Sequence, residues 1–219
     1  MDAIKSKIIQ YLESKQVSTE EIADILGKTG AVKGVYPINE GQYIAGEIQY
    51  VYAYNNSNWP VHEQLRDLKQ GRILFVDTIF VDDDHAVFGE LVSSFIMENQ
   101  KAKAIVVKGT MRDLDGIRKR KYPVWCKGIT PIGCFNVPPT KNAEIDRQAK
   151  QGMDYYDGAI AVCDTSGVVV IPKEEIKEDF ISKIDNMIEQ ERIWFECVEK
   201  KGWNTYDTVC LKKYKEKND

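Results

Sequence analysis

The chain has 219 residues, of which 43% are hydrophobic and 29% charged, and its formal net charge is −4. That length suits one domain able to bury about 70% of its unfolded surface. The mildly acidic balance gives no general attraction to nucleic acid or anionic lipid, so we expect neither partner. The sequence has no apolar signal segment and no run of about 18 apolar residues, which predicts a cytoplasmic protein that does not enter a membrane.

Two helices followed by a long strand are predicted at the start of the chain. Apolar residues recur at helical spacing over 4–12, and Ser18-Thr19-Glu20-Glu21 is a capping box that opens a second short helix ending at Gly27. The β-rich run 43–54 predicts a long strand, and the polar loop after it leads into a short helix around 61–68.

Strands and helices alternate in the middle of the chain. A strand is predicted over 72–77, a helix from Gly89 to about 99, and an all-apolar strand over 104–107 that bends at Gly109. Further strand signals occur at 122–126, 129–137, 159–163 and 168–171, and a long helix or helix pair is predicted over 176–198. Because helices alternate with strands and β-turn-β units follow, we predict a mixed α/β fold with layered sheets.

The pair Arg112-Asp113 is the leading candidate site. It follows the apolar strand 104–107, and ligands of α/β proteins bind near the carboxyl ends of strands. Upstream, Gly89-Glu90 opens a helix, and the free N–H groups of a first helical turn bind carboxylates or phosphates. The residues alone leave two interpretations open, a structural ion pair or a ligand site, and the ion pair is the commoner of the two.

Other motifs offer less. Gly27-Lys28-Thr29 resembles the end of a P-loop, but Ile22 stands where the first glycine is needed. No G-x-G-x-x-G and no G-x-S-x-G is present, which disfavours a dinucleotide site and a triad hydrolase. The acidic run Asp82-Asp83-Asp84 lacks the spacing of a calcium loop and predicts a solvated turn.

Several segments together resemble the RraA-like family. That family includes the 4-hydroxy-4-methyl-2-oxoglutarate/4-carboxy-4-hydroxy-2-oxoadipate aldolases and the regulator of ribonuclease activity A. In chain order, the segments are Ile22-Ala23-Asp24-Ile25-Leu26, Gly46, Asn58, 71–77, Phe88-Gly89-Glu90-Leu91, 105–113, Tyr122-Pro123-Val124-Trp125 and 158–172. Each is weakly specific alone, but they occur in the order of the family and are jointly specific.

The resemblance implies an α/β fold with layers in the order β/β/α, of the swivelling-domain type. N-terminal helices would precede the core, and a C-terminal helical extension would follow it. We therefore expect one RraA-like domain over 1–219, with its core at about 19–173 and the extension at 174–219. It also implies a homotrimer or homohexamer with sites between subunits.

The resemblance also assigns ligand roles. Asp113 would hold Mg²⁺ or Mn²⁺ largely through water, which suits a hard cation that keeps its hydration shell. Arg112 would bind the oxygens of a small 2-oxo acid. The substrate carboxylate would be bound by the backbone amides of Gly89, Glu90, Leu91 and Val92.

The implied reaction is retro-aldol cleavage or decarboxylation of that 2-oxo acid, as in a metal-dependent aldolase or an oxaloacetate decarboxylase. The metal and Arg112 would stabilise the pyruvate enolate. A carboxylate from the C-terminal helix of a neighbouring subunit, Glu189 or Glu191, would activate water.

The chain departs from the family pattern at Lys108, a position that is usually acidic. Lys108 lies four residues before Arg112, so we expect its charge either to weaken cation binding at Asp113 or to provide a second anion contact. The same departure motivates a second hypothesis, a non-catalytic regulatory protein that acts by binding another protein.

Overall fold

The computed structural model describes residues 3–215. The chain forms two compact units that divide after Lys177. The first unit holds all the described strands, and the second, from Glu178, is helical.

The first unit is built on a seven-stranded sheet with the order β1-β5-β4-β3-β2-β6-β7. Its strands are β1 (Tyr36–Pro37), β2 (Ile44–Tyr54), β3 (Ile73–Ile79), β4 (Ala104–Met111), β5 (Val124–Ile129), β6 (Ile160–Cys163) and β7 (Val168–Ile171). Strands β2, β3, β4 and β5 are parallel, so their carboxyl ends lie at one edge. Helices connect the successive parallel strands, as expected for β-α-β units.

Strand β2 belongs to two β layers. Its first four residues pair antiparallel with β6, whereas 48–54 pair parallel with β3. Apolar residues of the parallel strands, such as Phe75 and Val106, pack in one cluster with Ala161 and Val170 of β6 and β7. The two β layers therefore face each other across a buried core.

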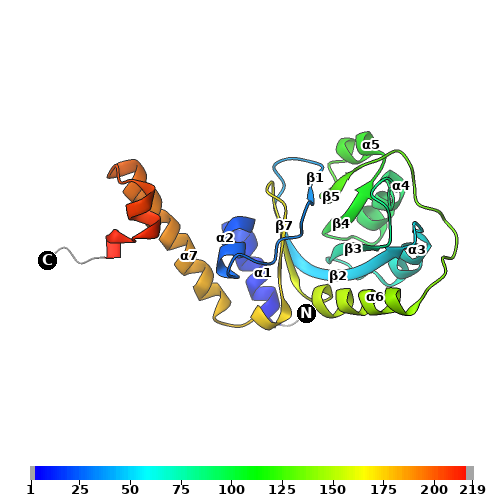
Figure 1. The fold of residues 1–219 in the computed structure, drawn as a ribbon, viewed down its shortest axis with the longest axis horizontal. Helices are drawn as coiled ribbons and strands as arrows, with labels where there is room; N and C mark the ends of the chain where they lie inside the picture. The colour runs from blue at the N-terminus through cyan, green and yellow to red at the C-terminus, as the bar shows by residue number, and fades with distance from the viewer. Residues whose placement is uncertain (1–2, 216–219) are drawn as a thin grey trace. The chain divides into compact units, whose positions relative to one another are not determined.

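Helices complete the layers. They are α1 (Ala3–Lys15), α2 (Thr19–Ile25), α3 (Trp59–Gln64), α4 (Glu90–Ser94), α5 (Leu114–Lys119) and α6 (Ala143–Tyr156). Helices α3, α4 and α5 cover one face of the parallel strands, and α6 lies along β2 on the other face (Figure 1). The expected layered β/β/α fold is confirmed.

The N-terminal helices form as the sequence predicts. The Ser18 hydroxyl accepts the Glu21 amide, and the Glu21 carboxylate accepts the Ser18 amide, which is the capping box. Helix α1 is joined to the sheet by Lys5, whose ammonium lies 2.7 Å from Glu47 Oε1 on β2.

The second unit consists of helical segments. Helix α7 (Phe180–Phe195) continues directly into a π-helical turn, Glu196–Lys200. Within this unit the Trp194 indole donates a hydrogen bond to the Tyr214 hydroxyl at 3.2 Å. The long helix predicted over 176–198 is therefore present, beginning a turn later.

Three parts of the middle of the chain differ from the prediction. The strand expected over 104–107 is present but continues to Met111, with a bulge between Val107 and Thr110. The segment 129–137 makes only isolated bridges beyond the end of β5. Helix α6 was not predicted, because strand signals on both sides of it suggested β-turn-β units throughout this region.

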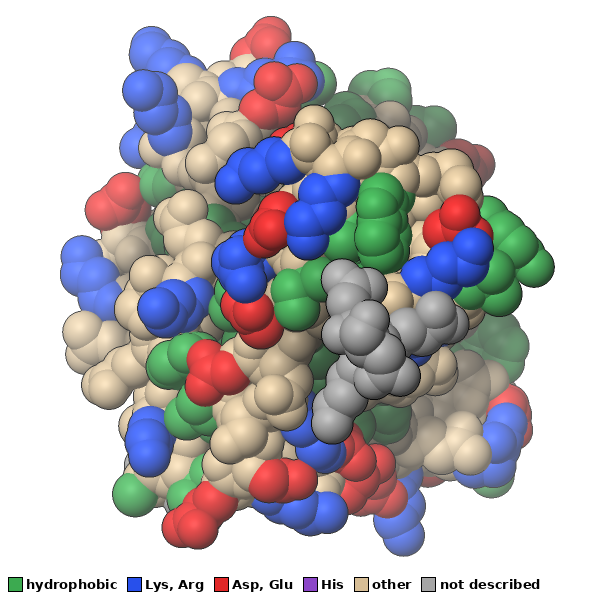
Figure 2. Space-filling model, turned by 90° about the vertical axis from the view of Figure 1, so that its left-hand side faces the viewer, with side chains coloured by type: hydrophobic (Ala, Val, Ile, Leu, Met, Phe, Trp, Pro, Cys, Tyr) green, Lys and Arg blue, Asp and Glu red, His purple; other side chains and the backbone are tan. Residues whose placement is uncertain are grey.

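The surface carries both signs of charge. On the face drawn in Figure 2, basic and acidic side chains are interspersed. Among the residues that the structure describes, no helix is both long and apolar enough to span a bilayer.

Candidate functional site

Arg112 and Asp113 lie where β4 ends and α5 begins. The Arg112 amide donates to the Phe88 carbonyl at 3.1 Å, which fixes the strand end against the loop before α4. Asp113 is the N-cap of α5 and adopts a left-handed conformation, with φ 61° and ψ 41°. Aspartate tolerates this conformation better than most residues, and here it turns the side chain back towards α4.

The Asp113 carboxylate contacts the start of α4. Its Oδ2 accepts a hydrogen bond from the Glu90 amide at 3.1 Å. A Cβ added to Gly89 would lie 2.1 Å from that oxygen and 2.7 Å from Arg112 Cγ. Glycine at position 89 therefore allows the acid, the arginine and the helix start to converge.

Arg112 and Asp113 do not form a tight ion pair. Arg112 Nε lies 3.7 Å from Asp113 Oδ2, and both side chains are about half exposed, at 48% and 47%. A single long contact between exposed groups contributes at most about 1 kcal/mol. Both groups thus retain hydrogen-bonding capacity for a ligand, which favours the site over the purely structural interpretation.

The other side of Arg112 contacts the segment after β5. A Cβ added to Gly133 would lie 2.5 Å from Arg112 Nη1. Burial raises the pKa of the neighbouring Cys134 thiol to about 11, although the Arg112 charge acts in the opposite direction. Cys134 is therefore a protonated thiol at neutral pH, not a nucleophile.

Helices α4 and α5 are held together beside the site. Arg120 Nε donates to Glu90 Oε1 at 2.8 Å. The Glu90 carboxylate passes over Gly116, where a Cβ would lie 2.0 Å from Oε2. The Glu90 side chain therefore has a structural partner, and its contribution to a ligand would come from its backbone.

Asp113 has the chemistry to hold a hard divalent cation. Its Oδ1 receives no hydrogen bond from residues 3–215, and its carboxylate is half exposed. Asp113 belongs to no group of three or more clustered ligand side chains among the described residues, so an ion there would keep most of its water, as Mg²⁺ does. The group in the described chain with three clustered ligand atoms is Asp82, Asp84 and His85, all within 4.8 Å of one another.

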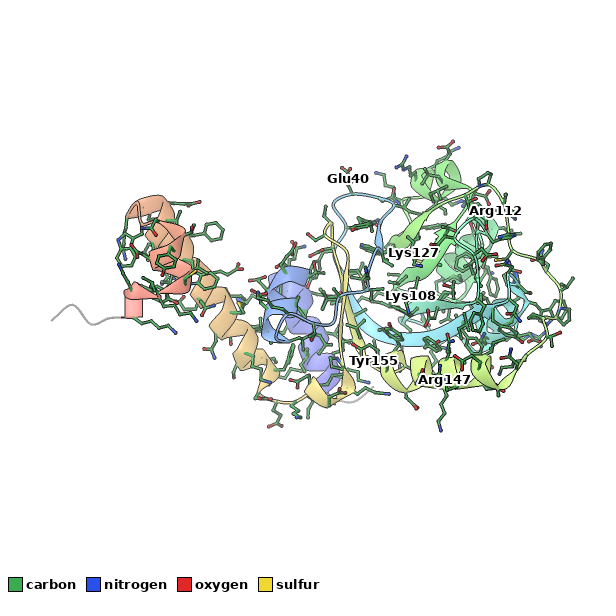
Figure 3. The ribbon with its side chains drawn as sticks, in the orientation of Figure 1. Glu40, Lys108, Arg112, Lys127, Arg147 and Tyr155 are labelled. Atoms are coloured by element: carbon green, nitrogen blue, oxygen red, sulfur yellow. The ribbon has the colours of Figure 1, made fainter. Side chains whose placement is uncertain are left out.

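Lys108 does not act beside Asp113, contrary to expectation. It lies on the sheet face covered by α6, where its ammonium is 3.2 Å from Asp77 Oδ1. In Figure 3 Lys108 is displaced from Arg112 towards Arg147 and Tyr155 of α6. Alternate residues of a strand point to opposite faces of the sheet, and a β-bulge shifts this alternation. Because Arg112 lies beyond the bulge of β4, its side chain is on the other face from Lys108, and the expectation was wrong.

Glu189 and Glu191 both lie on α7, in the second unit. Glu189 pairs with Arg192 at 2.7 Å, which lowers the pKa of its carboxyl. Of the predicted site residues, the structure thus brings together Arg112, Asp113, Gly89 and Glu90, with Leu91 and Val92 on the same first turn of α4. The contribution of Glu191 stays a prediction.

Three residues at this site were not predicted from the sequence: Gly116, Arg120 and Gly133. Arg120 contacts a residue 30 positions away, and Gly133 lies in a segment that was predicted as a strand. Two of the three are glycines whose role is to leave room for a neighbour. A glycine far in sequence from the side chain it accommodates gives no local signal.

The family model RraA-like (Aldolase/RraA) matches residues 19–170. The chain belongs to this family. Protein DlpA of Legionella pneumophila is 25% identical over 206 residues, which cover 88% of this chain but only 32% of DlpA, so the chain spans about a third of that relative. A Halalkalibacterium halodurans protein named "Putative 4-hydroxy-4-methyl-2-oxoglutarate aldolase" is 25% identical, covering 77% of this chain and 79% of that protein.

Solved structures agree on the fold. Streptomyces coelicolor RraAS2, described as an unusual member of the RNase ES inhibitor RraA protein family, superposes with a TM-score of 0.65 at 18% identity. The match covers 88% of this chain and 94% of that one. This RraA-like family includes named aldolases as well as regulators.

Proposed function

We propose that this RraA-like protein is a divalent-metal-dependent lyase that cleaves or decarboxylates a small 2-oxo acid. The observation that carries the proposal is the convergence of Asp113, Arg112 and the Glu90 amide around Gly89. A carboxylate able to hold Mg²⁺ or Mn²⁺, a guanidinium and a backbone donor are the groups that an anionic keto acid requires.

Each residue has a distinct task in this proposal. Arg112 binds the oxygens of the 2-oxo acid through its planar set of N–H donors. The amides of Glu90, Leu91 and Val92 at the start of α4 orient the substrate carboxylate. Asp113 holds the cation, which when bound supplies positive charge to stabilise the developing enolate.

Bond cleavage needs little more from the chain than orientation and charge. When the carbon–carbon bond breaks, its electron pair moves onto the pyruvate unit, and Arg112 stabilises the resulting negative charge. In retro-aldol cleavage a base removes the proton of the substrate's hydroxyl group as the bond breaks, which leaves a carbonyl product, whereas decarboxylation releases CO₂. In both reactions the enolate carbon then gains a proton to give pyruvate. We assign these proton transfers to Glu191 of a neighbouring subunit, in a homotrimer or homohexamer.

The test is pyruvate release from oxaloacetate and from a 4-hydroxy-2-oxo diacid with Mg²⁺, corrected for the rate without protein. We expect Asp113→Asn to lower turnover by at least about 100-fold, because the uncharged amide keeps the shape but loses the cation. Asp115→Asn, which removes an exposed charge two residues away, is the matched control. Equal turnover in both variants, or no pyruvate from either acid, would contradict the proposal.

An exposed apolar surface supports a second candidate, a regulator that acts by binding another protein. Leu91 is 84% exposed and Phe95 41%, and both border a cavity of about 390 Å³. Large exposed apolar side chains mark protein contacts. This candidate predicts a stoichiometric complex that survives Arg112→Ala and is lost in Leu91→Asp, with no pyruvate release by the wild type.

A further inference from the structure

A second cavity lies on the opposite face of the parallel strands from Arg112 and Asp113. Its volume is about 340 Å³, within the range of small-ligand sites. It lies at the carboxyl end of β3, beside Lys108 of β4 and helix α6, and the carboxyl ends of strands are where α/β proteins bind ligands. The site described above does not use it.

The floor of this cavity holds Asp77 in a fixed position. Its side chain is 11% exposed, its Oδ1 accepts the Thr78 amide at 2.9 Å, and its Oδ2 faces the Tyr50 hydroxyl at 3.4 Å. Burial, and secondarily the Asp77 charge, raises the pKa of Tyr50, so that hydroxyl stays protonated. Asp77 is therefore held in place by the Thr78 amide and the Tyr50 hydroxyl, and it serves as an anchor for Lys108.

Lys108 extends over this anchor. Its ammonium lies 3.2 Å from Asp77 Oδ1 and 5.9 Å from the centre of the Tyr156 ring, and its side chain is 39% exposed. An ammonium has three N–H donors, and its contact with Asp77 is an ion pair rather than a hydrogen bond. Lys108 is thus oriented by protein contacts but keeps donors for a ligand.

Helix α6 provides a row of donors along the cavity wall. Arg147, Gln151 and Tyr155 are spaced four residues apart and share one helix face. Arg147 Nε donates to Glu144 Oε2 at 2.8 Å and Arg147 Nη1 to Gln151 Oε1 at 3.1 Å, so the Gln151 amide hydrogens are the donors left for another acceptor. Figure 3 shows Lys108 and these two labelled residues, Arg147 and Tyr155, in the same part of the molecule.

The absence of a side chain at Gly152 lets the helix and the anchor coexist. A Cβ at this position would lie 2.0 Å from the Tyr50 hydroxyl oxygen. Any larger residue would displace Tyr50 from Asp77 and, through Asp77, Lys108. The cavity is therefore formed by the close packing of α6 against the sheet and not by a gap between loops.

We propose that this cavity binds a small oxyanion, a carboxylate or a phosphate group, between Lys108 and the α6 row. Lys108 gives the cavity a cation whose partner Asp77 is already hydrogen-bonded, whereas the charge of Arg147 is paired with Glu144. The remaining polar groups of the lining are chiefly donors, among them the Gln151 amide. Multiple donors and a cation are what an oxyanion requires. The proposal is independent of the lyase reaction, because it uses none of the residues at Arg112.

The test is direct binding, with inorganic phosphate followed by ³¹P NMR line broadening and acetate by saturation-transfer NMR. We expect saturable binding of one or both, weakened at least about tenfold by Lys108→Met. Lys127→Met, which removes a lysine from neighbouring β5, is the control and should bind as the wild type does. Which of the two anions binds identifies the chemical group recognised.

A second variant covers the case in which Lys108→Met does not fold. Gln151→Leu removes an exposed donor of α6 and leaves the Lys108–Asp77 pair intact, and we expect it to weaken binding at least about threefold. The proposal is overturned by either of two results: no saturable binding of either anion, or wild-type affinity in the folded Lys108 or Gln151 variant.

Discussion

The backbone amide of Glu90 donates to Asp113 Oδ2 at 3.1 Å, joining the start of α4 to the start of α5 across 23 positions of sequence. This bond places the Asp113 carboxylate against the helix turn that the family resemblance implies is the substrate loop. Both groups reach this arrangement only because Gly89 has no side chain.

Gly89→Ala should therefore impair catalysis without unfolding the protein. Its Cβ would fall 2.1 Å from Asp113 Oδ2, so Asp113 and Arg112 must shift, and displacement of catalytic groups by about 1 Å costs about 100-fold in rate. The measurement is pyruvate release, with circular dichroism to check the fold. Gly128→Ala is the control, because its nearest neighbour would be Thr110 Cγ2 at an ordinary 3.8 Å.

How far the sequence predicts the site depends on distance along the chain. Arg112, Asp113 and Gly89 were identified because the strand and helix that carry them have strong local patterns. The face of the sheet on which Lys108 lies was not predicted, because a β-bulge between Val107 and Thr110 shifts the alternation of side chains along β4. Helix α6 was missed although Asn142 accepts the Ile145 amide as an N-cap, since the strands around it dominated the pattern.

In the core too, local patterns were predicted from the sequence and contacts between distant residues were not. Strands β2, β3 and β7 were predicted because apolar runs bounded by turns indicate buried strands. The role of Glu47 was not foreseen, since its partners Lys5 and Arg72 lie 42 and 25 positions away. A buried charge becomes intelligible only when the fold shows what neutralises it.

Glu47→Ala should destabilise the first unit. Glu47 is 6% exposed and pairs with both Lys5 and Arg72, so its removal leaves two cations poorly solvated, at a cost of about 3 kcal/mol. Urea denaturation followed by circular dichroism measures the loss. In the control, Asp24→Ala breaks an exposed pair with Lys28 and should cost less than about 1 kcal/mol. Equal losses in the two variants would refute this assignment.

The Cys134 thiol should react slowly at neutral pH and faster in base. Because burial raises its pKa to about 11, about 0.1% is thiolate at pH 8, and the alkylation rate should rise about tenfold per pH unit up to pH 10. Peptide mapping after brief iodoacetamide treatment gives the rate at each pH. The exposed Cys210 in the same sample shows that the reagent is active. A plateau near pH 9 would contradict the assignment.

A site shared between subunits predicts complementation between two inactive variants. Arg112→Gln and Glu191→Gln should each lose most activity, because one lacks the substrate contact and the other the proton carrier. When equal amounts are unfolded and refolded together, about a quarter of the sites in a ring receive both native residues, so about a quarter of wild-type activity should return. The control mixes Arg112→Gln with itself, and light scattering measures the subunit number. Activity that stays at the level of the separate variants, with mixed oligomers present, would remove Glu191 from the proposed site.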